Sequence, residues 1–410
     1  MQLNRVVITG MGAVSPFGCG VSRLCDALYS GASAVAFYPP AAEVRGLRCL
    51  VAAAVPPVDA AQIPRRFRRS MSAMSIYAVL AAGEALRQGR VDDELCRSGR
   101  LGVAVGSTVV SSAVSERFFG DYFPDNNIEK MKTTLFFQLM NHTCASNVAQ
   151  SYAISGRQLA PAAACATGSQ AIGFACEMIA AGRQDMMLCG GADELHPLTS
   201  ATFDVMNAAS TAYNDDPGQT PRPFAADRDG MVCGEGAGVV LLESLPSALR
   251  RGADILAEVV GFATASDTGS IANPDAAVMA RCMTAALDDA GISAAQVDYV
   301  NAHATATESG DIAESQAIEQ VFGSAMALSS LKGHIGHTLA ACGALETIAC
   351  VEMMRCGRLL PTLHLHQVDE RCACLDYVRA VRERQAEIIV KNNFALGGVN
   401  TSLVLRRYHA

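Results

Sequence analysis

Cys165 is the first residue whose surroundings suggest chemistry. It lies in the run 161–168, where most of its neighbours are alanine, and a helical pattern follows at 169–182. Unpaired backbone N–H groups and the positive dipole end at a helix start favour a thiolate over a thiol. We therefore expect the pKa of Cys165 to be lowered and its sulfur to act as a nucleophile, with inert packing as the alternative.

Two further turns place polar side chains among glycine, alanine and threonine, next to apolar strands or helices. They span 301–311 and 329–337. A single histidine in such a turn is commonly a structural hydrogen-bonding residue, but two of these turns together with a cysteine turn favour one shared site. The residues in or just after these turns that could do chemistry are His303, Thr305, Thr307, Glu314, Lys332, His334 and His337.

Metal and dinucleotide sites are weaker interpretations of the same sequence. His334 and His337 could share a metal on a helix, but a third and fourth ligand are not evident nearby, and Cys372 and Cys374 match no zinc spacing closely. The glycine-rich run at 9–16 lacks the third glycine of a dinucleotide turn and contains a proline. We expect no metal and no tightly bound cofactor.

The elements that must position these turns alternate between strand and helix, which predicts an α/β layered fold. The second half of the chain repeats the order of elements of the first half, so we expect a duplication at the level of fold. Expected strands are 5–8, 101–105, 186–188, 239–242, 255–262, 297–301, 386–390 and 401–406, and expected helices are 72–87, 169–182, 276–290, 311–321 and 345–355.

Composition narrows the class of protein. The chain has 410 residues, 50% hydrophobic and 18% charged, which is enough for an extensive core. A net charge of -8 argues against a broad basic surface for nucleic acid. The sequence has no signal-like start, no long uncharged apolar run, and an odd count of 15 cysteines without a disulfide spacing. We expect a cytoplasmic protein with reduced thiols and no membrane span.

The cysteine and histidine turns, together with several glycine-rich blocks, resemble the chain-elongating members of the β-ketoacyl-[acyl-carrier-protein] synthase family, over nearly the whole chain. This resemblance implies a thiolase-like α/β fold of two duplicated halves in a five-layered α-β-α-β-α core. It divides the chain into 1–252, which carries the cysteine, and 253–410, which carries the two histidines. The matching blocks are 5–16, 164–168, 190–194, 222–224, 227–230, 234–238, 303–311, Lys332 with 336–337, and 393–400.

The resemblance also implies a reaction, a decarboxylative Claisen condensation. Cys165 would take an acyl chain from an acyl carrier protein, and malonyl carrier protein would then lose CO2 and extend a fatty-acid or polyketide chain by two carbons. Neutral His303 and His337 would donate hydrogen bonds to the enolate, and the backbone N–H groups of Cys165 and Phe394 would hold the second oxyanion.

Further roles follow from the same resemblance. Lys332 and Glu314 would form a charged pair that orders the histidine loops. Thr305 and Thr307 would contact the phosphopantetheine arm of the carrier protein, which serves as substrate carrier.

The chain departs from the family pattern beside the site. Ala304 and Ala395 stand where glycine is usual, and Leu396 replaces a gating phenylalanine. Val109 falls in the segment that lines the acyl pocket in relatives. These departures indicate altered gating and favour a specialised lipid or polyene pathway.

Other activities in the wider family fit less well. Thiolases have a second cysteine near a C-terminal glycine turn, whereas 397–398 carries none, and chain-initiating enzymes have asparagine where this chain has His337. Silent chain-length partners usually lack the nucleophile that Cys165 supplies. Relatives are dimers that use a region matching 133–140, so we expect a homodimer or a heterodimer with a chain-length subunit.

Overall fold

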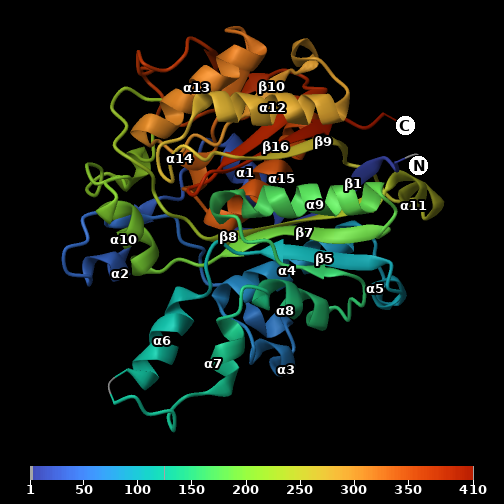
Figure 1. Ribbon diagram of the computed structural model, residues 1–410, viewed down its shortest axis with the longest axis vertical. Helices are drawn as coiled ribbons and strands as arrows, with labels where there is room; N and C mark the ends of the chain where they lie inside the picture. The colour runs from blue at the N-terminus through green and yellow to red at the C-terminus, as the bar shows by residue number, and fades with distance from the viewer. Residues whose placement is uncertain (1–2, 124, 410) are drawn as a thin grey trace.

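The computed structural model describes residues 3–123 and 125–409, and its secondary structure is stacked in five layers (Figure 1). Two central helices, α9 (Thr167–Ala180) and α15 (Cys342–Cys356), lie between two layers of strands. Helices α4 (Ala73–Gln88) and α8 (Thr143–Ser151) cover one outer face. Helices α12 (Ala276–Ala290) and α13 (Glu308–Phe322) cover the other. The predicted α-β-α-β-α arrangement is confirmed.

The strands form one continuous 12-stranded mixed sheet that has two parts with the same internal order. When the five strands of each part are numbered along the chain, they lie side by side in the order 1-5-4-2-3. In both parts the first two pairings in that order are antiparallel and the last two pairings are parallel. This shared order supports our prediction of a duplicated fold. The strands are β1 (Val6–Ser15), β5 (Leu101–Gly106), β6 (Gln158–Leu159), β7 (Met186–Asp193) and β8 (Gly236–Ser244) in the first part, and β9 (Ala257–Ser266), β10 (Tyr299–Asn301), β11 (Ala327–Ser329), β15 (Ile388–Phe394) and β16 (Val399–Arg406) in the second.

Strands β1 and β9 pair antiparallel and join the two parts. The second part is extended by β13 (Asp376–Tyr377) next to β11. Shorter elements complete the chain: β2 (Gly18–Cys19), α1 (Val21–Tyr29), β3 (Ala36–Phe37), α2 (Pro39–Ala42), β4 (Val51–Ala52), α3 (Arg65–Arg68), α5 (Asp93–Arg97), α6 (Ser112–Tyr122), α7 (Thr133–Gln138), α10 (Pro197–Val205), α11 (Leu245–Arg250), α14 (Lys332–Ile335), β12 (Arg358–Leu359) and β14 (Arg382–Glu383).

Two glycines explain how closely these layers pack. The run 9–16, which resembles a dinucleotide turn, is mostly part of β1, and a Cβ on Gly12 would lie 1.9 Å from the carbonyl oxygen of Ala81 in α4. A Cβ on Gly168 would lie 2.5 Å from the carbonyl oxygen of Ala340, just before α15. The second contact fixes the start of α9 against the start of α15, because no larger residue fits there.

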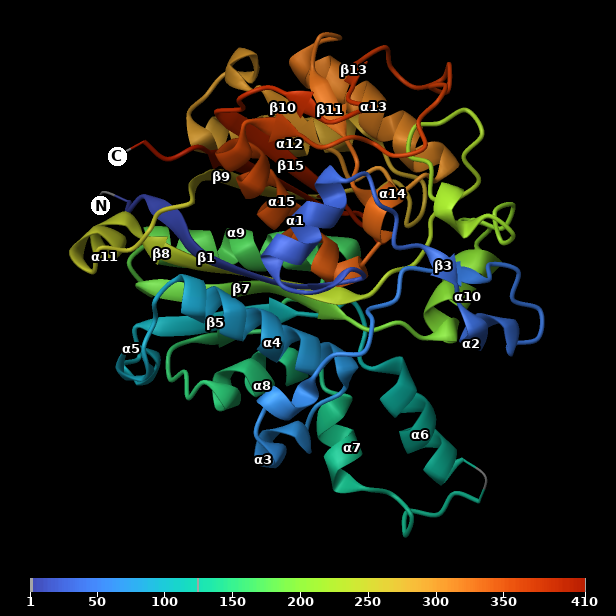
Figure 2. The ribbon, with the colours of Figure 1, turned by 180° about the vertical axis from the view of Figure 1, so that it is seen from behind.

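Helices α6 and α7 form an arm that projects from the body of the molecule (Figure 2). Phe118 packs on Phe119 and Phe136 within the arm. Phe119, Phe123 and Phe136 remain 45%, 65% and 54% exposed. The arm therefore carries a cluster of aromatic side chains that the other described residues leave partly exposed.

Among the helices of the described residues, none is both long enough and apolar enough to cross a membrane.

Candidate active site

Cys165 lies in a short 3-10 turn, Ala164–Ala166, that leads directly into α9. Ala164 has a φ of 47°, a left-handed conformation that costs alanine energy and is common at functional turns. The hydroxyl of Thr167 locks the turn, because it accepts from the Ala163 N–H at 2.8 Å and donates to the Ala164 carbonyl at 2.7 Å. This local structure directs the Cys165 side chain into a cavity.

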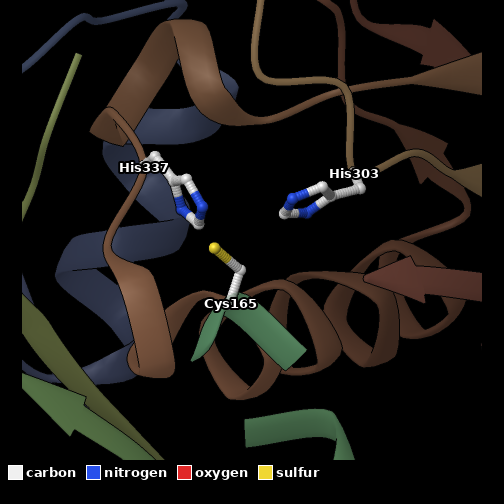
Figure 3. A group of neighbouring side chains, drawn as sticks. All are labelled: Cys165, His303 and His337. Atoms are coloured by element: carbon white, nitrogen blue, oxygen red, sulfur yellow. The ribbon is translucent and has the colours of Figure 1, made fainter. Parts of the chain in front are cut away.

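His303 and His337 face the cysteine from two different loops (Figure 3). One ring nitrogen of each histidine and the sulfur all lie within 4.8 Å of one another. The two imidazole centres are 5.2 Å apart and their planes cross at 81°. The structure therefore brings together the three residues that the sequence analysis singled out from turns far apart in the chain.

The protonation of His337 is fixed by its backbone surroundings. Its Nδ1 accepts the backbone N–H of Leu339 at 3.2 Å. A neutral imidazole has one N–H, so the proton must be on Nε2. That Nε2 is buried and has no hydrogen-bond partner among the described residues, which leaves it free to donate to a bound substrate.

Glu314 of α13 holds the loop that carries His303. Its two carboxylate oxygens accept the backbone N–H groups of His303 at 2.8 Å and Ala304 at 2.7 Å. Burial raises the pKa of Glu314 to about 7, opposed by these two N–H groups. Glu314 therefore positions the histidine loop through backbone hydrogen bonds.

The predicted charged pair between Lys332 and Glu314 is wrong. The ammonium of Lys332 instead pairs with Oε1 of Glu346 in α15, and both side chains are completely buried. Burial lowers the pKa of Lys332, but Glu346 outweighs this and the pKa is raised. The two oxygens of Glu314 instead accept backbone hydrogen bonds from the His303 loop.

The expected lowering of the Cys165 pKa is also wrong. Burial raises the pKa of Cys165 to about 12, although Lys332 and the backbone N–H of Leu396 act in the opposite direction. The same burial, with the charge of Lys332 next, lowers the pKa of both His303 and His337 far below the usual value. Burial therefore favours a thiol at Cys165 and neutral imidazoles at His303 and His337.

Hydrogen bonding by the backbone of Leu396, and by that of Cys165 itself, acts to lower the pKa of the Cys165 thiol. We predicted that the backbone N–H of Phe394, with that of Cys165, lies at the oxyanion of the acyl group. Phe394 lines the same cavity, but it is the last residue of β15, two residues before Leu396. A backbone N–H beside the Cys165 sulfur is also placed to stabilise negative charge on an acyl group that is bonded to this sulfur.

The three side chains open into a cavity of about 630 Å³. Thr305 and Thr307, whose hydroxyls are 3.1 Å apart, line it together with Ala395 and Leu396. Val109 does not belong to this lining and is 48% exposed, so its place in an acyl pocket stays a prediction. Ala304 and Ala395 both have ordinary negative φ values, so alanine causes no backbone strain there.

The position of His334 is explained by contacts with the backbone and not by a metal site shared with His337. Nδ1 of His334 lies 2.9 Å from the carbonyl oxygen of Ala32, and Nε2 lies 3.2 Å from that of Pro361. His334 therefore joins two distant loops and does not share a site with His337.

The sequence analysis assigned no role to three residues of the site, Glu346, Lys391 and Asn393, although Asn393 begins one of the matching blocks. Glu346 and Lys391 are charged yet completely buried, in a helix and a strand whose other residues are nearly all buried. A charged residue inside an otherwise apolar element was the signal that could have identified them, because burying a charge is costly unless it is paired.

Comparison with known proteins gives a consistent picture. A family model described as "Beta-ketoacyl synthase, N-terminal domain" matches residues 3–248, and one described as "Beta-ketoacyl synthase, C-terminal domain" matches residues 256–366. The chain is 34% identical to the 3-oxoacyl-[acyl-carrier-protein] synthase 1 of Escherichia coli, with 99% of both chains covered.

Solved structures agree with these matches. A β-ketoacyl synthase from Burkholderia phymatum is 46% identical, with a TM-score of 0.96 over 99% of this chain and 100% of that one. A ketosynthase solved with its type II polyketide acyl carrier protein, AntDE:AntF, is 30% identical, with a TM-score of 0.91 and complete coverage of both chains.

Proposed function

The chain belongs to the β-ketoacyl synthase family, and from this premise we propose that it catalyses carbon–carbon bond formation between an acyl thioester on Cys165 and malonyl-acyl carrier protein. It is an acyltransferase-class condensing enzyme of thiolase-like fold, and its substrates are carried on the phosphopantetheine arm of acyl carrier protein. The single observation that carries the assignment of residues is the cluster of Cys165, His303 and His337, which all line one cavity.

The first half-reaction loads the enzyme. The Cys165 sulfur attacks the carbonyl carbon of the acyl thioester, the bond from that carbon to the phosphopantetheine sulfur breaks, and the departing sulfur ends with the proton that Cys165 loses. Negative charge develops on the acyl oxygen during this exchange. The backbone N–H groups of Cys165 and Leu396 are the donors that stabilise it in our proposal.

The second half-reaction uses the two imidazoles. Loss of CO2 from the malonyl thioester leaves its electron pair as an enolate, whose oxygen carries the new charge. Both His303 and His337 donate an N–H to that oxygen, which a neutral imidazole does without a proton being transferred. The enolate carbon then attacks the acyl group on Cys165, the carbon–sulfur bond breaks, and the chain is lengthened by two carbons. The sulfur leaves as a thiolate and takes up one proton from water, which restores the thiol for the next loading.

The function is tested with purified enzyme, acyl carrier protein bearing acyl groups of several lengths, and malonyl carrier protein. Intact-protein mass spectrometry is expected to show one acyl group on the enzyme after the first substrate and a β-ketoacyl carrier protein after the second. An enzyme that gains no acyl mass from any of these donors would contradict the proposal.

We also propose that Leu396 acts as the gate between the cavity and the cysteine. Its side chain is 37% exposed and lines the cavity, and its backbone acts to lower the pKa of the Cys165 thiol. Leucine is smaller than the phenylalanine usual in the family, so the opening is wider for a bulky acyl chain.

Leu396→Phe is expected to slow loading of long acyl chains about tenfold relative to short ones, since one change of pocket shape is worth about 1–3 kcal/mol of discrimination. Loading rates for each donor measure this effect. Leu396→Met, which keeps the volume, is the matched control and should retain the preference of the parent enzyme. If Leu396→Phe slowed the loading of short and long acyl donors equally, Leu396 would not act as a gate.

Assembly with a second chain is a further part of the proposal. The α6–α7 arm exposes Phe119, Phe123 and Phe136, and exposed aromatic clusters are typical of protein interfaces. We propose that a second copy of this chain, or a related chain-length subunit, covers the arm. Sedimentation of the purified chain distinguishes the homodimer from the heterodimer by its mass. A chain that is monomeric alone and dimerises only with a different subunit would exclude the homodimer.

A further inference from the structure

Lys391 is a second buried lysine at the active site, and the mechanism above gives it no role. It lies on β15, is completely buried, and its ammonium is 3.2 Å from Oε2 of Glu346. The other oxygen of Glu346 is taken by Lys332. Two ammonium groups thus share one carboxylate, so part of the charge of Lys391 has to be stabilised by other groups.

Asn393 and Ser169 supply that stabilisation. The Lys391 ammonium donates to the side-chain oxygen of Asn393 and to the hydroxyl of Ser169, the latter at 2.9 Å. Ser169 in turn donates to the same Asn393 oxygen at 2.6 Å. Asn393 therefore has an oxygen that receives two donors, one of them charged.

These contacts fix which way the Asn393 amide faces. If the amide were flipped, its NH2 group would point at the Lys391 ammonium, and two sets of donors would oppose each other. With the oxygen toward Lys391, the NH2 group lies 3.1 Å from Nδ1 of His303 and 3.4 Å from Oε2 of Glu346. Nδ1 of His303 must then be the acceptor, which puts the proton of the neutral ring on Nε2.

We infer that Lys391 and Asn393 are positioning residues that hold His303 as the neutral tautomer with its proton on Nε2, the same tautomer that the Leu339 backbone imposes on His337. The two imidazoles then present matching N–H groups to the enolate oxygen. This inference rests on the proposed function for its purpose, but the tautomer itself follows from contacts within the chain.

The electrostatic surroundings favour the neutral form of His303. Burial is the largest effect that lowers its pKa, and the charges of Lys332 and Lys391 and the neighbouring titratable ring of His337 act in the same direction. The carboxylates nearest the ring do not offset this. Glu314 is engaged by the backbone of the His303 loop, and Glu346 by the two lysines.

The tautomer can be measured directly. In full-length enzyme labelled with 15N-histidine, the ring nitrogens of His303 are identified by the signals that His303→Ala loses. The Nδ1 signal is expected at the position of an unprotonated nitrogen and the Nε2 signal at that of a protonated one. A protonated Nδ1 in the unsubstituted enzyme overturns the inference whatever the variants do.

Asn393→Asp replaces the donor facing Nδ1 by an acceptor. The His303 proton should move to Nδ1, and malonyl decarboxylation should fall about 10²–10³-fold, as when one oxyanion donor is lost. Acyl loading of Cys165 should stay within a few fold, because it does not use the His303 N–H. Lys391→Met frees the amide to turn, and a loss of about tenfold in decarboxylation alone is expected.

A buried control separates this role from simple loosening of the core. Tyr299→Phe removes a buried hydroxyl that contacts Ser329 and touches neither histidine, so decarboxylation and the His303 signals should not change. Unchanged His303 signals in Asn393→Asp, or equal losses in loading and decarboxylation for both variants, would overturn the inference. If the unsubstituted enzyme neither loads nor decarboxylates, the proposed function fails instead, while the tautomer measurement still stands.

Discussion

Cys165→Ala is expected to abolish acyl transfer completely while malonyl decarboxylation continues. The acyl chain must form a covalent bond to a nucleophile, and alanine offers no atom for it. Decarboxylation needs only donors at the enolate oxygen, and both imidazoles keep their surroundings when the thiol is removed. Intact-protein mass spectrometry should show no acyl adduct, and CO2 release from malonyl carrier protein should persist.

Cys282→Ala is the matched control for this experiment. Cys282 is another completely buried cysteine, on α12 and outside the lining of the cavity. This variant should load and elongate as the parent enzyme does. An acyl adduct of undiminished yield on Cys165→Ala would assign the nucleophile to another residue, and loss of CO2 release in a folded Cys165→Ala would contradict the division of labour between thiol and imidazoles.

The parts of the site that the sequence predicted correctly are those set by local structure. The cysteine turn and the two histidine turns each consist of a few small residues next to a regular element, so their shape depends mostly on neighbours in the chain. The layered α/β fold followed from alternating patterns spread over the whole length.

The errors concern contacts between residues distant in sequence. Glu314 and Glu346 are both buried carboxylates on helices after a histidine turn, and only the packing of α13 and α15 decides which one meets Lys332. The pKa of Cys165 depended on burial from all sides, which outweighed the helix start that is visible in the sequence. The choice of Leu396 over Phe394 depended on where β15 ends and the turn begins.

The predicted location of Val109 differs from these cases. The resemblance placed it in a pocket, and in this chain its side chain is half exposed and outside the cavity. A pocket residue that one chain leaves exposed fits an assembly in which a second chain completes the wall, and this cannot be derived from the composition of a single segment.

Glu346→Gln is expected to have the largest effect on stability of any single change at the site. The substitution keeps the shape of the side chain but leaves Lys332 and Lys391 buried without a counter-charge. Removing one partner of a buried ion pair costs about 3–5 kcal/mol in the free energy of unfolding, and here two cations lose the same partner. Urea denaturation of the full chain, followed by circular dichroism, measures the loss.

The pH dependence of that loss tests its electrostatic origin. Burial already lowers the pKa of Lys391 in the parent chain, and in Glu346→Gln both lysines should have depressed pKa values when folded and ordinary values when unfolded. The unfolded state then binds more protons than the folded state, so the stability of the variant should rise with pH on the alkaline side of neutrality. Adding Lys391→Met to Glu346→Gln removes one of the two cations and should recover part of the stability. A Glu346→Gln variant as stable as the parent, or one whose instability is the same at pH 7 and pH 9, would mean that the two lysines do not depend on Glu346 for their charge.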